Sequence, residues 1–343
     1  MTTNQAKHSI NFAEWQPAKP SLEEWMEGAS LRVANRLYVI GGYQTLTKMC
    51  PRMQICDIES GEWTYGPELP AGFPLSHAGI ASDGRFLFFV SGQPGPACEH
   101  ATDRCWALDL KTMAWQQMAP LPGARFAPVL EYLDGNLHLI SGATEDRVTI
   151  CGDHFVMKIR NKDDQVSSLP DIEMQVWREA PPVPEGGDHA GSVVYDSRIY
   201  MIGGEHGHAG VTMDAAACCG TYCAHNFLFR YDPRTEQWER LADMLFGTSH
   251  IEAQILIVDD RIVVLGGTGD QDILVDRVQE YDPAENSWTE LSPLPQGRKG
   301  GLVWQWKHTV YFNGGQIGEK VGTEVVATTM ASKIERVSSS SEQ

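Results

Sequence analysis

Residues 198–204 read RIYMIGG, and residues 261–267 read RIVVLGG. In both segments a run of β-branched or aromatic residues ends at two glycines, which is typical of a strand that enters a tight turn. The arrangement occurs six times, and its doublets of small residues are Gly41-Gly42, Ser91-Gly92, Ser141-Gly142, Gly203-Gly204, Gly266-Gly267 and Gly314-Gly315. A period of about 50 residues is typical of propeller blades, so six doublets predict six blades.

A second element of the repeat lies after the doublets. The first five doublets are each followed by a tryptophan, at Trp63, Trp115, Trp177, Trp238 and Trp288. Turn sequences such as YDPRTEQW (231–238) and YDPAENSW (281–288) precede the tryptophans and predict a hairpin between two outer strands. Each unit is therefore expected to be a four-stranded antiparallel meander, and the chain an all-β protein.

The two ends of the chain differ from the repeat. The sixth doublet is followed by a strand-like run at 321–334 but by no tryptophan, whereas Trp15 stands alone before the first doublet. We therefore expect the N-terminal strand to close the last blade, which would leave no open sheet edge at the seam. This interpretation makes residues 1–334 one domain, with blade insertions near 143–176 and 205–225, and it makes residues 335–343 a disordered tail.

The pattern of a doublet followed by a tryptophan resembles the kelch repeat over almost the whole chain. Three segments, at 81–98, 187–204 and 249–268, resemble the galactose-oxidase-like group of kelch proteins. Kelch propellers include enzymes, binding modules and adaptor scaffolds, so the resemblance implies the fold and leaves the function open. The copper pattern of two tyrosines and two histidines is not recognised in the sequence, so copper radical oxidation is not expected.

Composition argues against two classes of partner. The formal net charge is −18, and nucleic acids or anionic membranes require a basic surface. The first 15 residues lack the apolar core of a secretory signal, and no run of apolar residues is long enough to span a membrane. We therefore expect a cytoplasmic protein with neither a nucleic-acid nor a membrane partner.

Ionisable residues recur at one position of the repeat. Counting 14 to 16 residues back from each doublet reaches the expected start of the innermost strand, at the mouth of the central channel. These residues are Glu27, His77, Arg125, His189, His250 and Arg298, and Glu252 and Lys299 lie next to two of them. Polar groups in a narrow channel are costly to desolvate, so the set predicts a functional site.

Three imidazoles and two guanidiniums suit a carboxylated sugar. We expect Arg125 and Arg298 to hold the substrate carboxylate, His77 and His189 to transfer the proton, and His250 to orient the substrate. Glu27, Glu252 and Lys299 are expected to bind the substrate. This chemistry predicts a lyase that performs β-elimination on uronic-acid oligosaccharides; a mutarotase or epimerase of an acidic sugar, or a non-enzymatic interaction module, is the alternative.

The insertion in the fourth repeat carries a group of metal-ligand residue types, namely His206, His208, Cys218, Cys219, Cys223 and His225. Two cysteines and two histidines can bind tetrahedral zinc, and the preferred set is His208, Cys219, Cys223 and His225. Reduced surface thiols beside a histidine loop are the alternative. The cluster resembles the structural zinc site of propeller-fold ulvan lyases, and that resemblance implies a structural zinc and catalytic tyrosines, for which Tyr43 and Tyr222 are best placed.

Overall fold

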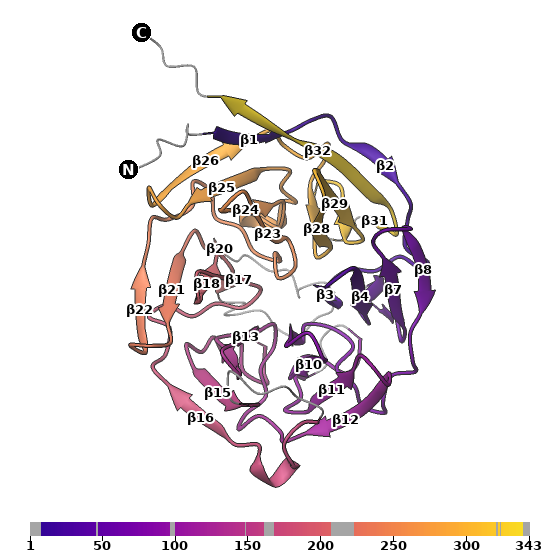
Figure 1. The fold of residues 1–343 in the computed structure, drawn as a ribbon, viewed down its shortest axis with the longest axis vertical. Helices are drawn as coiled ribbons and strands as arrows, with labels where there is room; N and C mark the ends of the chain where they lie inside the picture. The colour runs from indigo at the N-terminus through magenta and orange to yellow at the C-terminus, as the bar shows by residue number, and fades with distance from the viewer. Residues whose placement is uncertain are drawn as a thin grey trace, which may run out of the picture.

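The computed structural model describes residues 8–45, 47–96, 100–147, 149–160, 168–206, 223–319, 322 and 324–338. Within these residues, six antiparallel sheets surround one central axis (Figure 1). The prediction of an all-β, six-bladed β-propeller is confirmed. The helices in this part of the chain are two 3-10 turns, η1 (Ile172–Met174) and η2 (Asp270–Asp272). Neither has the length and apolar composition of a membrane-crossing helix.

Each blade is a meander that runs from the channel outward. Blade 1 contains β3 (Ala29–Val33), β4 (Arg36–Ile40), β7 (Met53–Asp57) and β8 (Glu62–Tyr65), and blade 2 contains β9 (Gly79–Ser82), β10 (Phe86–Val90), β11 (Cys105–Asp109) and β12 (Ala114–Met118). Blade 3 contains β13 (Val129–Leu133), β14 (Asn136–Ile140), β15 (His154–Lys158) and β16 (Trp177–Ala180), and blade 4 contains β17 (Gly191–Tyr195), β18 (Arg198–Ile202), β21 (Leu228–Asp232) and β22 (Gln237–Arg240). Blade 5 contains β23 (Ile255–Val258), β24 (Arg261–Leu265), β25 (Val278–Asp282) and β26 (Ser287–Leu291), and blade 6 contains β28 (Leu302–Trp306), β29 (Thr309–Asn313), β32 (Thr329–Ser338), β1 (His8–Phe12) and β2 (Gln16–Ala18).

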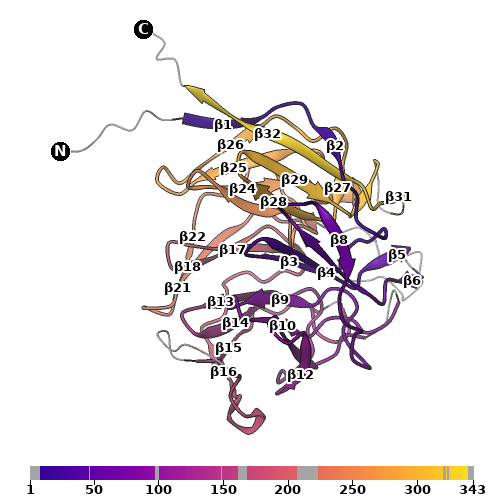
Figure 2. The ribbon, with the colours of Figure 1, turned by 45° about the vertical axis from the view of Figure 1, so that its right-hand side comes forward.

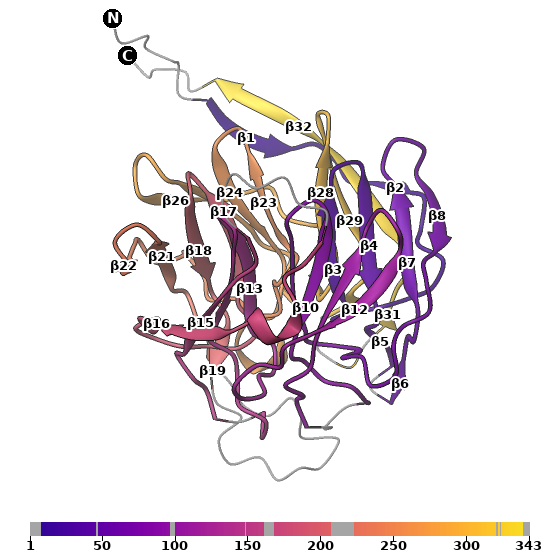
Figure 3. The ribbon, with the colours of Figure 1, turned by 60° about the horizontal axis from the view of Figure 1, so that its bottom comes forward.

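Short strands lie between the blades, on the face of the ring where the doublets turn (Figure 3). They are β5 (Tyr43–Thr45), β6 (Lys48–Met49), β19 (Glu205–His206), β20 (Cys223–Ala224), β27 (Arg298–Lys299), β30 (Gln316–Ile317) and β31 (Glu324–Val325). The hairpins between the first and second strands of each blade lie at the opposite end of the innermost strands. The channel therefore has two different ends, one made by doublet loops and one made by hairpins.

The doublet is needed because the chain turns there against the next blade. Gly42 has φ +90°, and a Cβ atom on it would lie 2.6 Å from the carbonyl oxygen of Met26. Its N–H donates to the carbonyl of Leu75 in blade 2, and the second glycine of every other doublet makes the corresponding bond to the following blade. The repeat that identifies the fold in the sequence is thus also the contact that joins consecutive blades.

The repeated tryptophans join the blades at their outer strands. The indole N–H of Trp115 donates to the carbonyl of Glu68, and those of Trp238 and Trp288 donate to Pro181 and Ala242. Each acceptor belongs to the connection that follows the preceding blade. The constant spacing of the tryptophans therefore reflects one hydrogen bond that recurs from blade to blade.

The N-terminal strand closes the ring, as the sequence predicted. Figure 2 shows β1 beside β32, and Phe12 is paired with Ile334. β2 pairs with the start of β32, from Gln16 opposite Ala331 to Ala18 opposite Thr329. The prediction of a disordered tail from residue 335 is wrong at its start, because β32 continues to Ser338 through its pairing with β1. Residues 339–343 lie outside the described residues.

The two expected insertions are placed differently. In blade 3 the additional residues lie between β15, which ends at Lys158, and β16, which begins at Trp177; the strands on either side keep the repeat. The insertion expected at 205–225 begins with β19 and ends in β20, and residues 207–222 lie outside the described residues.

Deletion of residues 1–20 should destabilise the whole ring. It removes both strands that pair with β32, together with the buried side chains of Ile10, Phe12 and Trp15. Loss of three such side chains lowers the free energy of unfolding by roughly 5 kcal/mol or more. Chemical denaturation measures the change, and deletion of residues 1–7, which keeps β1 and β2, is the control. Equal stability of the two deletions would contradict closure through the N-terminal strand.

Candidate functional site at the floor of the channel

Six residues at the start of the innermost strands form a closed circle around the axis. Their backbone N–H groups each donate to the carbonyl of the preceding member at 2.8–3.2 Å, and all six have φ between 46° and 64°. The members are Glu27, His77, Ala127, His189, His250 and Gly300. The left-handed backbone directs one residue of every blade to the axis, and we call these residues the axial ring.

The axial ring confirms four positions predicted from the sequence and corrects two. Ala127 and Gly300 occupy the places expected for Arg125 and Arg298, which lie two residues earlier in the chain. A constant offset of 14 residues from the doublet finds five members, but blade 5 needs an offset of 16 because of additional residues after His250. Allowing both offsets admitted the two arginines.

Neither arginine can act as the expected carboxylate clamp in the channel. Arg125 donates to the carbonyls of Gly123 and Ala124 and pairs with Asp153. Arg298 is 1% exposed, donates to the carbonyls of Gly314 and Thr328, and stacks on Phe312. Both guanidiniums hold loops of their own blades in place.

Glu27 lies at the centre of one half of the ring. Its carboxylate accepts from Lys299 Nζ at 2.5 Å and lies 3.1 Å from Nε2 of His77 and 3.6 Å from Nε2 of His250. Burial alone would raise the pKa of Glu27, but Lys299 and His77 outweigh it and hold that pKa well below its usual value. Burial lowers the pKa of His77 to about 4, so His77 is a neutral imidazole.

His189 and Glu252 form an ion pair in the other half. Nδ1 of His189 donates to Oε1 of Glu252 at 2.7 Å. Burial would lower the pKa of His189, yet Glu252 and the neighbouring carboxylates raise it to about 9. Burial and the charge of His189 hold the pKa of His250 well below its usual value. The two imidazoles stack with ring centroids 3.8 Å apart, so one charged and one neutral histidine share a face.

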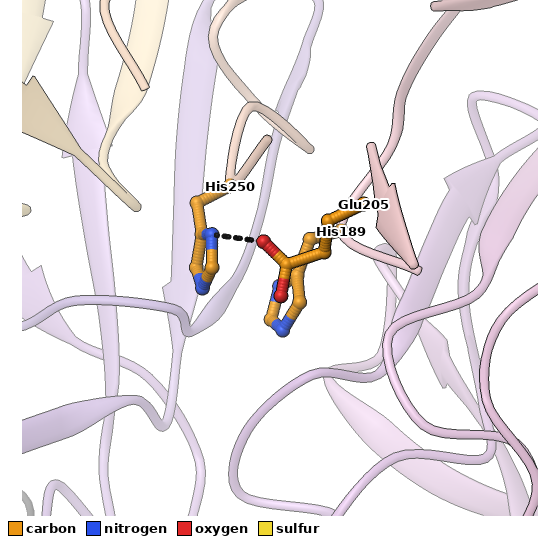
Figure 4. A group of neighbouring side chains, drawn as sticks. All are labelled: His189, Glu205 and His250. Atoms are coloured by element: carbon orange, nitrogen blue, oxygen red, sulfur yellow. Dashed lines mark ion pairs between the residues drawn. The ribbon is translucent and has the colours of Figure 1, made fainter. Parts of the chain in front are cut away.

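Carboxylates that were not predicted lie directly beside these histidines. Asp188 and Glu205 are both fully buried and face each other across an isolated β-bridge, and burial raises the pKa of each. Figure 4 shows the Glu205 carboxylate next to both imidazole rings. The sequence does carry a signal for them: an acidic residue precedes His189 and another follows the doublet Gly203-Gly204.

The remaining predicted site residues are separated from the channel or lie outside the described residues. Tyr43 is 2% exposed, and its hydroxyl donates to Gln93 and accepts from Ser76. It therefore packs behind His77, with ring centroids 5.6 Å apart, rather than in the channel. Tyr222, His208 and Cys219 are outside the described residues, and of Cys223 only the backbone in β20 is described.

His225 is the one member of the predicted zinc set whose side chain is described. It is 6% exposed, its Nε2 contacts Nδ1 of His206, and its Nδ1 has no hydrogen-bond partner among the described residues. Burial lowers its pKa to about 4, which keeps the imidazole neutral, as a metal ligand must be. His206, outside the preferred set, is thus close to His225, whereas the full predicted set is not tested.

The channel above the axial ring is a cavity of about 770 Å³, lined by the innermost strands of all six blades. A smaller space of about 40 Å³ at its floor is lined by Glu27, His77, Ala127, Glu252 and Gly300. Toward the hairpin end the lining includes Arg32, Trp306 and Lys307. The five-residue strand β3 gives the cavity a depth of roughly 15 Å.

The comparisons with known proteins agree with the fold. The Kelch motif family matches residues 188–245 and 253–295, within blades 4 and 5. Kelch repeat-containing protein At3g27220 of Arabidopsis thaliana is 29% identical over 311 residues, which cover 88% of this chain and 71% of that protein. Kelch-like protein terF of Aspergillus terreus is 29% identical over 308 residues, covering 85% of this chain and 61% of that protein, and Kelch-like protein 36 of Rattus norvegicus is 29% identical over 43% of this chain and 23% of that protein.

Among solved structures, the one titled "Structure of YjhT" superposes with a TM-score of 0.69 and 15% identity over 93% of this chain and 99% of that chain. At this identity the similarity concerns the fold. The chain is thus a β-propeller with kelch repeats, and the resemblance to uronate lyases stays a prediction.

Replacement of Gly300 by alanine should disturb the axial ring. The backbone there has φ +64°, and a Cβ atom would lie 3.0 Å from Cγ of Glu27. Gly300→Ala should lower the free energy of unfolding by about 1–2 kcal/mol, because a left-handed backbone disfavours side chains. Ala127→Gly, at φ +46° in the same ring, should keep or raise stability and is the control. Denaturant titration measures both, and an equal loss in the two variants would contradict the steric argument.

Proposed function

We propose that this protein binds an acidic carbohydrate in its central channel and acts on it by proton transfer at the channel floor. The observation that carries the proposal is the cavity of about 770 Å³, with cations and an indole near its hairpin end and carboxylates deeper inside. Its size is typical of small-molecule sites in proteins. Its position on the propeller axis lets residues from all six blades contact one ligand.

The hairpin end supplies the groups for the carboxylate and one face of a sugar ring. The guanidinium of Arg32 and Nζ of Lys307 lie 5.9 Å and 5.6 Å from the ring centroid of Trp306. Arg32 donates from Nε to Ala34 and from Nη1 to Gln305, which uses two of its five N–H donors. The other donors suit a carboxylate, and the indole face suits the C–H face of a sugar.

The middle and floor of the cavity supply acceptors for hydroxyl groups. Glu131 and Ser192 line the wall, and the Ser192 hydroxyl donates to Glu131 Oε1 at 2.6 Å. Burial raises the pKa of Glu131 to about 7. Glu252 has a 31% exposed side chain at the floor and is oriented by His189, so it is the carboxylate best placed to accept a proton from a ligand.

This arrangement favours isomerisation over β-elimination. Elimination requires a clamp on the carboxylate next to the carbon that loses its proton, and the cations near the floor, Lys299 and His189, are each paired with a glutamate. In mutarotation, Glu252 would take the proton of the anomeric hydroxyl while water protonates the ring oxygen and the ring opens. Closure on the other face returns both protons, and no carboxylate clamp is needed.

The Arg32→Ala/Lys307→Ala double variant should bind glucuronate and galacturonate about tenfold more weakly, because it loses charge-assisted hydrogen bonds. Binding of glucose and galactose should not change. Calorimetry measures both, and Lys111→Ala, an exposed lysine in a turn of blade 2, is the charge control.

Equal loss of neutral and acidic sugars, or no sugar binding by the unmodified protein, would contradict the proposal. The same samples report the reaction, since anomer exchange is visible by NMR and an unsaturated uronate by ultraviolet absorbance. Binding without either signal would identify a non-enzymatic binding module.

We further propose that the loop between β19 and β20 is held by a structural zinc ion bound by His208, Cys219, Cys223 and His225. The supporting observation is the buried Nδ1 of His225, which has no hydrogen-bond partner among the described residues. Zinc would supply a covalent-like crosslink and no chemistry on the sugar.

Cobalt substitution tests the thiolate ligands of this loop. Cobalt bound to Cys219 and Cys223 should show intense sulfur-to-metal charge-transfer absorption, and Cys223→Ser should weaken it. Cys105→Ser, at a buried cysteine of blade 2, is the control. A cobalt spectrum without charge-transfer absorption would contradict cysteine ligation.

A further inference from the structure

A second group of possible ligands lies just beneath the channel floor, between blades 4 and 5. His189, Glu205 and His250 each place a ligand atom within 4.8 Å of the other two, and all three residues are buried (Figure 4). Nδ1 of His250 is 3.5 Å from Oε2 of Glu205. Ligands of a tetrahedral ion at about 2.1 Å lie about 3.4 Å from each other, so this pair already has the spacing of two metal ligands.

Two carboxylates of this group are buried without the bonds that normally accompany burial. Asp188 and Glu205 have no measurable exposure. Neither oxygen of Asp188, nor Oε1 of Glu205, has a hydrogen-bond partner among the described residues. A buried carboxylate without a partner is costly, so the arrangement lacks a positive charge at this point.

The backbone fixes the two carboxylates on the same side. Asp188 and Glu205 exchange N–H to C=O hydrogen bonds in an isolated antiparallel bridge, and side chains of directly paired residues project from the same face. Because Asp188 directly precedes His189, its carboxylate belongs to the surroundings of the same three ligands.

The neighbouring groups act as the outer supports that metal ligands require. Glu252 accepts from Nδ1–H of His189, which fixes the tautomer that keeps Nε2 unprotonated. The Ser249 hydroxyl donates to Oε2 of Glu205 at 2.6 Å and lies 3.0 Å from Nδ1 of His250. Carboxylates that hold a ligand histidine are typical of zinc centres.

We propose that His189, Glu205 and His250 bind one divalent transition-metal ion, with Asp188 as a further carboxylate ligand. Two imidazoles with carboxylates form a nitrogen and oxygen set that suits zinc and its first-row neighbours, whereas calcium and magnesium prefer oxygen alone. The ion compensates the buried negative charge. It differs from the zinc proposed for the loop, which uses thiolates, and it does not depend on sugar binding.

Zinc titration of chelator-treated protein tests this site. The Cys219→Ser/Cys223→Ser variant removes the thiolates and should still bind one equivalent of zinc by calorimetry. Glu205→Gln in that background should abolish stoichiometric binding, and Glu252→Gln, which changes an outer support, should weaken it about 10- to 100-fold. Glu280→Gln is the matched control, because Glu280 is also a buried carboxylate with one oxygen lacking a hydrogen-bond partner, and it lies in blade 5 outside the group.

Unfolding measurements separate loss of the site from loss of the fold. Without metal, Glu205→Gln should melt at or above the temperature of the parent, because it removes a buried charge; added zinc should raise the melting temperature of the parent alone. Absence of stoichiometric binding in the thiolate-free parent, or unchanged binding in Glu205→Gln, would overturn the proposal and leave a proton shared by Asp188 and Glu205. No sugar is present in these assays, so their failure is distinct from failure of the carbohydrate proposal.

Discussion

A closed circle of six N–H to C=O hydrogen bonds around the axis holds the starts of the innermost strands together. The circle requires a left-handed backbone at every member, and five of the six are not glycine, so each of those positions carries a conformational cost. The same conformation places Glu27, His77, His189 and His250 at the axis. The backbone geometry that closes the propeller is therefore also what concentrates its ionisable side chains.

Burial determines what these side chains are. In water the three histidines of the axial ring would titrate in the same range, but here His189 is held charged by Glu252 while burial keeps His77 and His250 neutral. Lys299 is confined to Glu27 in the same way. The charges of the floor are thus largely matched within the protein, and the unmatched ones, on Asp188 and Glu205, lie below it.

The sequence was sufficient for the fold because each doublet and tryptophan makes a bond that repeats in every blade. It was less reliable for the site. Arg125 and Arg298 were misplaced by two residues, because the distance from axis to doublet is longer in blade 5 than elsewhere. Asp188 and Glu205 were missed because their relation is a bridge between separate segments, although Ser76 with Gln93 and Phe126 with Ala143 form the same bridge in other blades. Aligning the repeats on that bridge, instead of on the doublet alone, places both carboxylates beside the histidines.

The pairing of β1 with β32 has a consequence for synthesis. Phe12 reaches its partner Ile334 only after nearly the whole chain has left the ribosome, which takes roughly half a minute at typical elongation rates. During that interval the last blade lacks its outer strand, and the apolar residues of β1 have no sheet to join. Blades 1 to 5 can form in order during translation, whereas the ring closes after chain release. The nascent protein therefore passes through an open arc with two unpaired edges, which is the stage at which chaperones or unwanted strand pairing compete with folding.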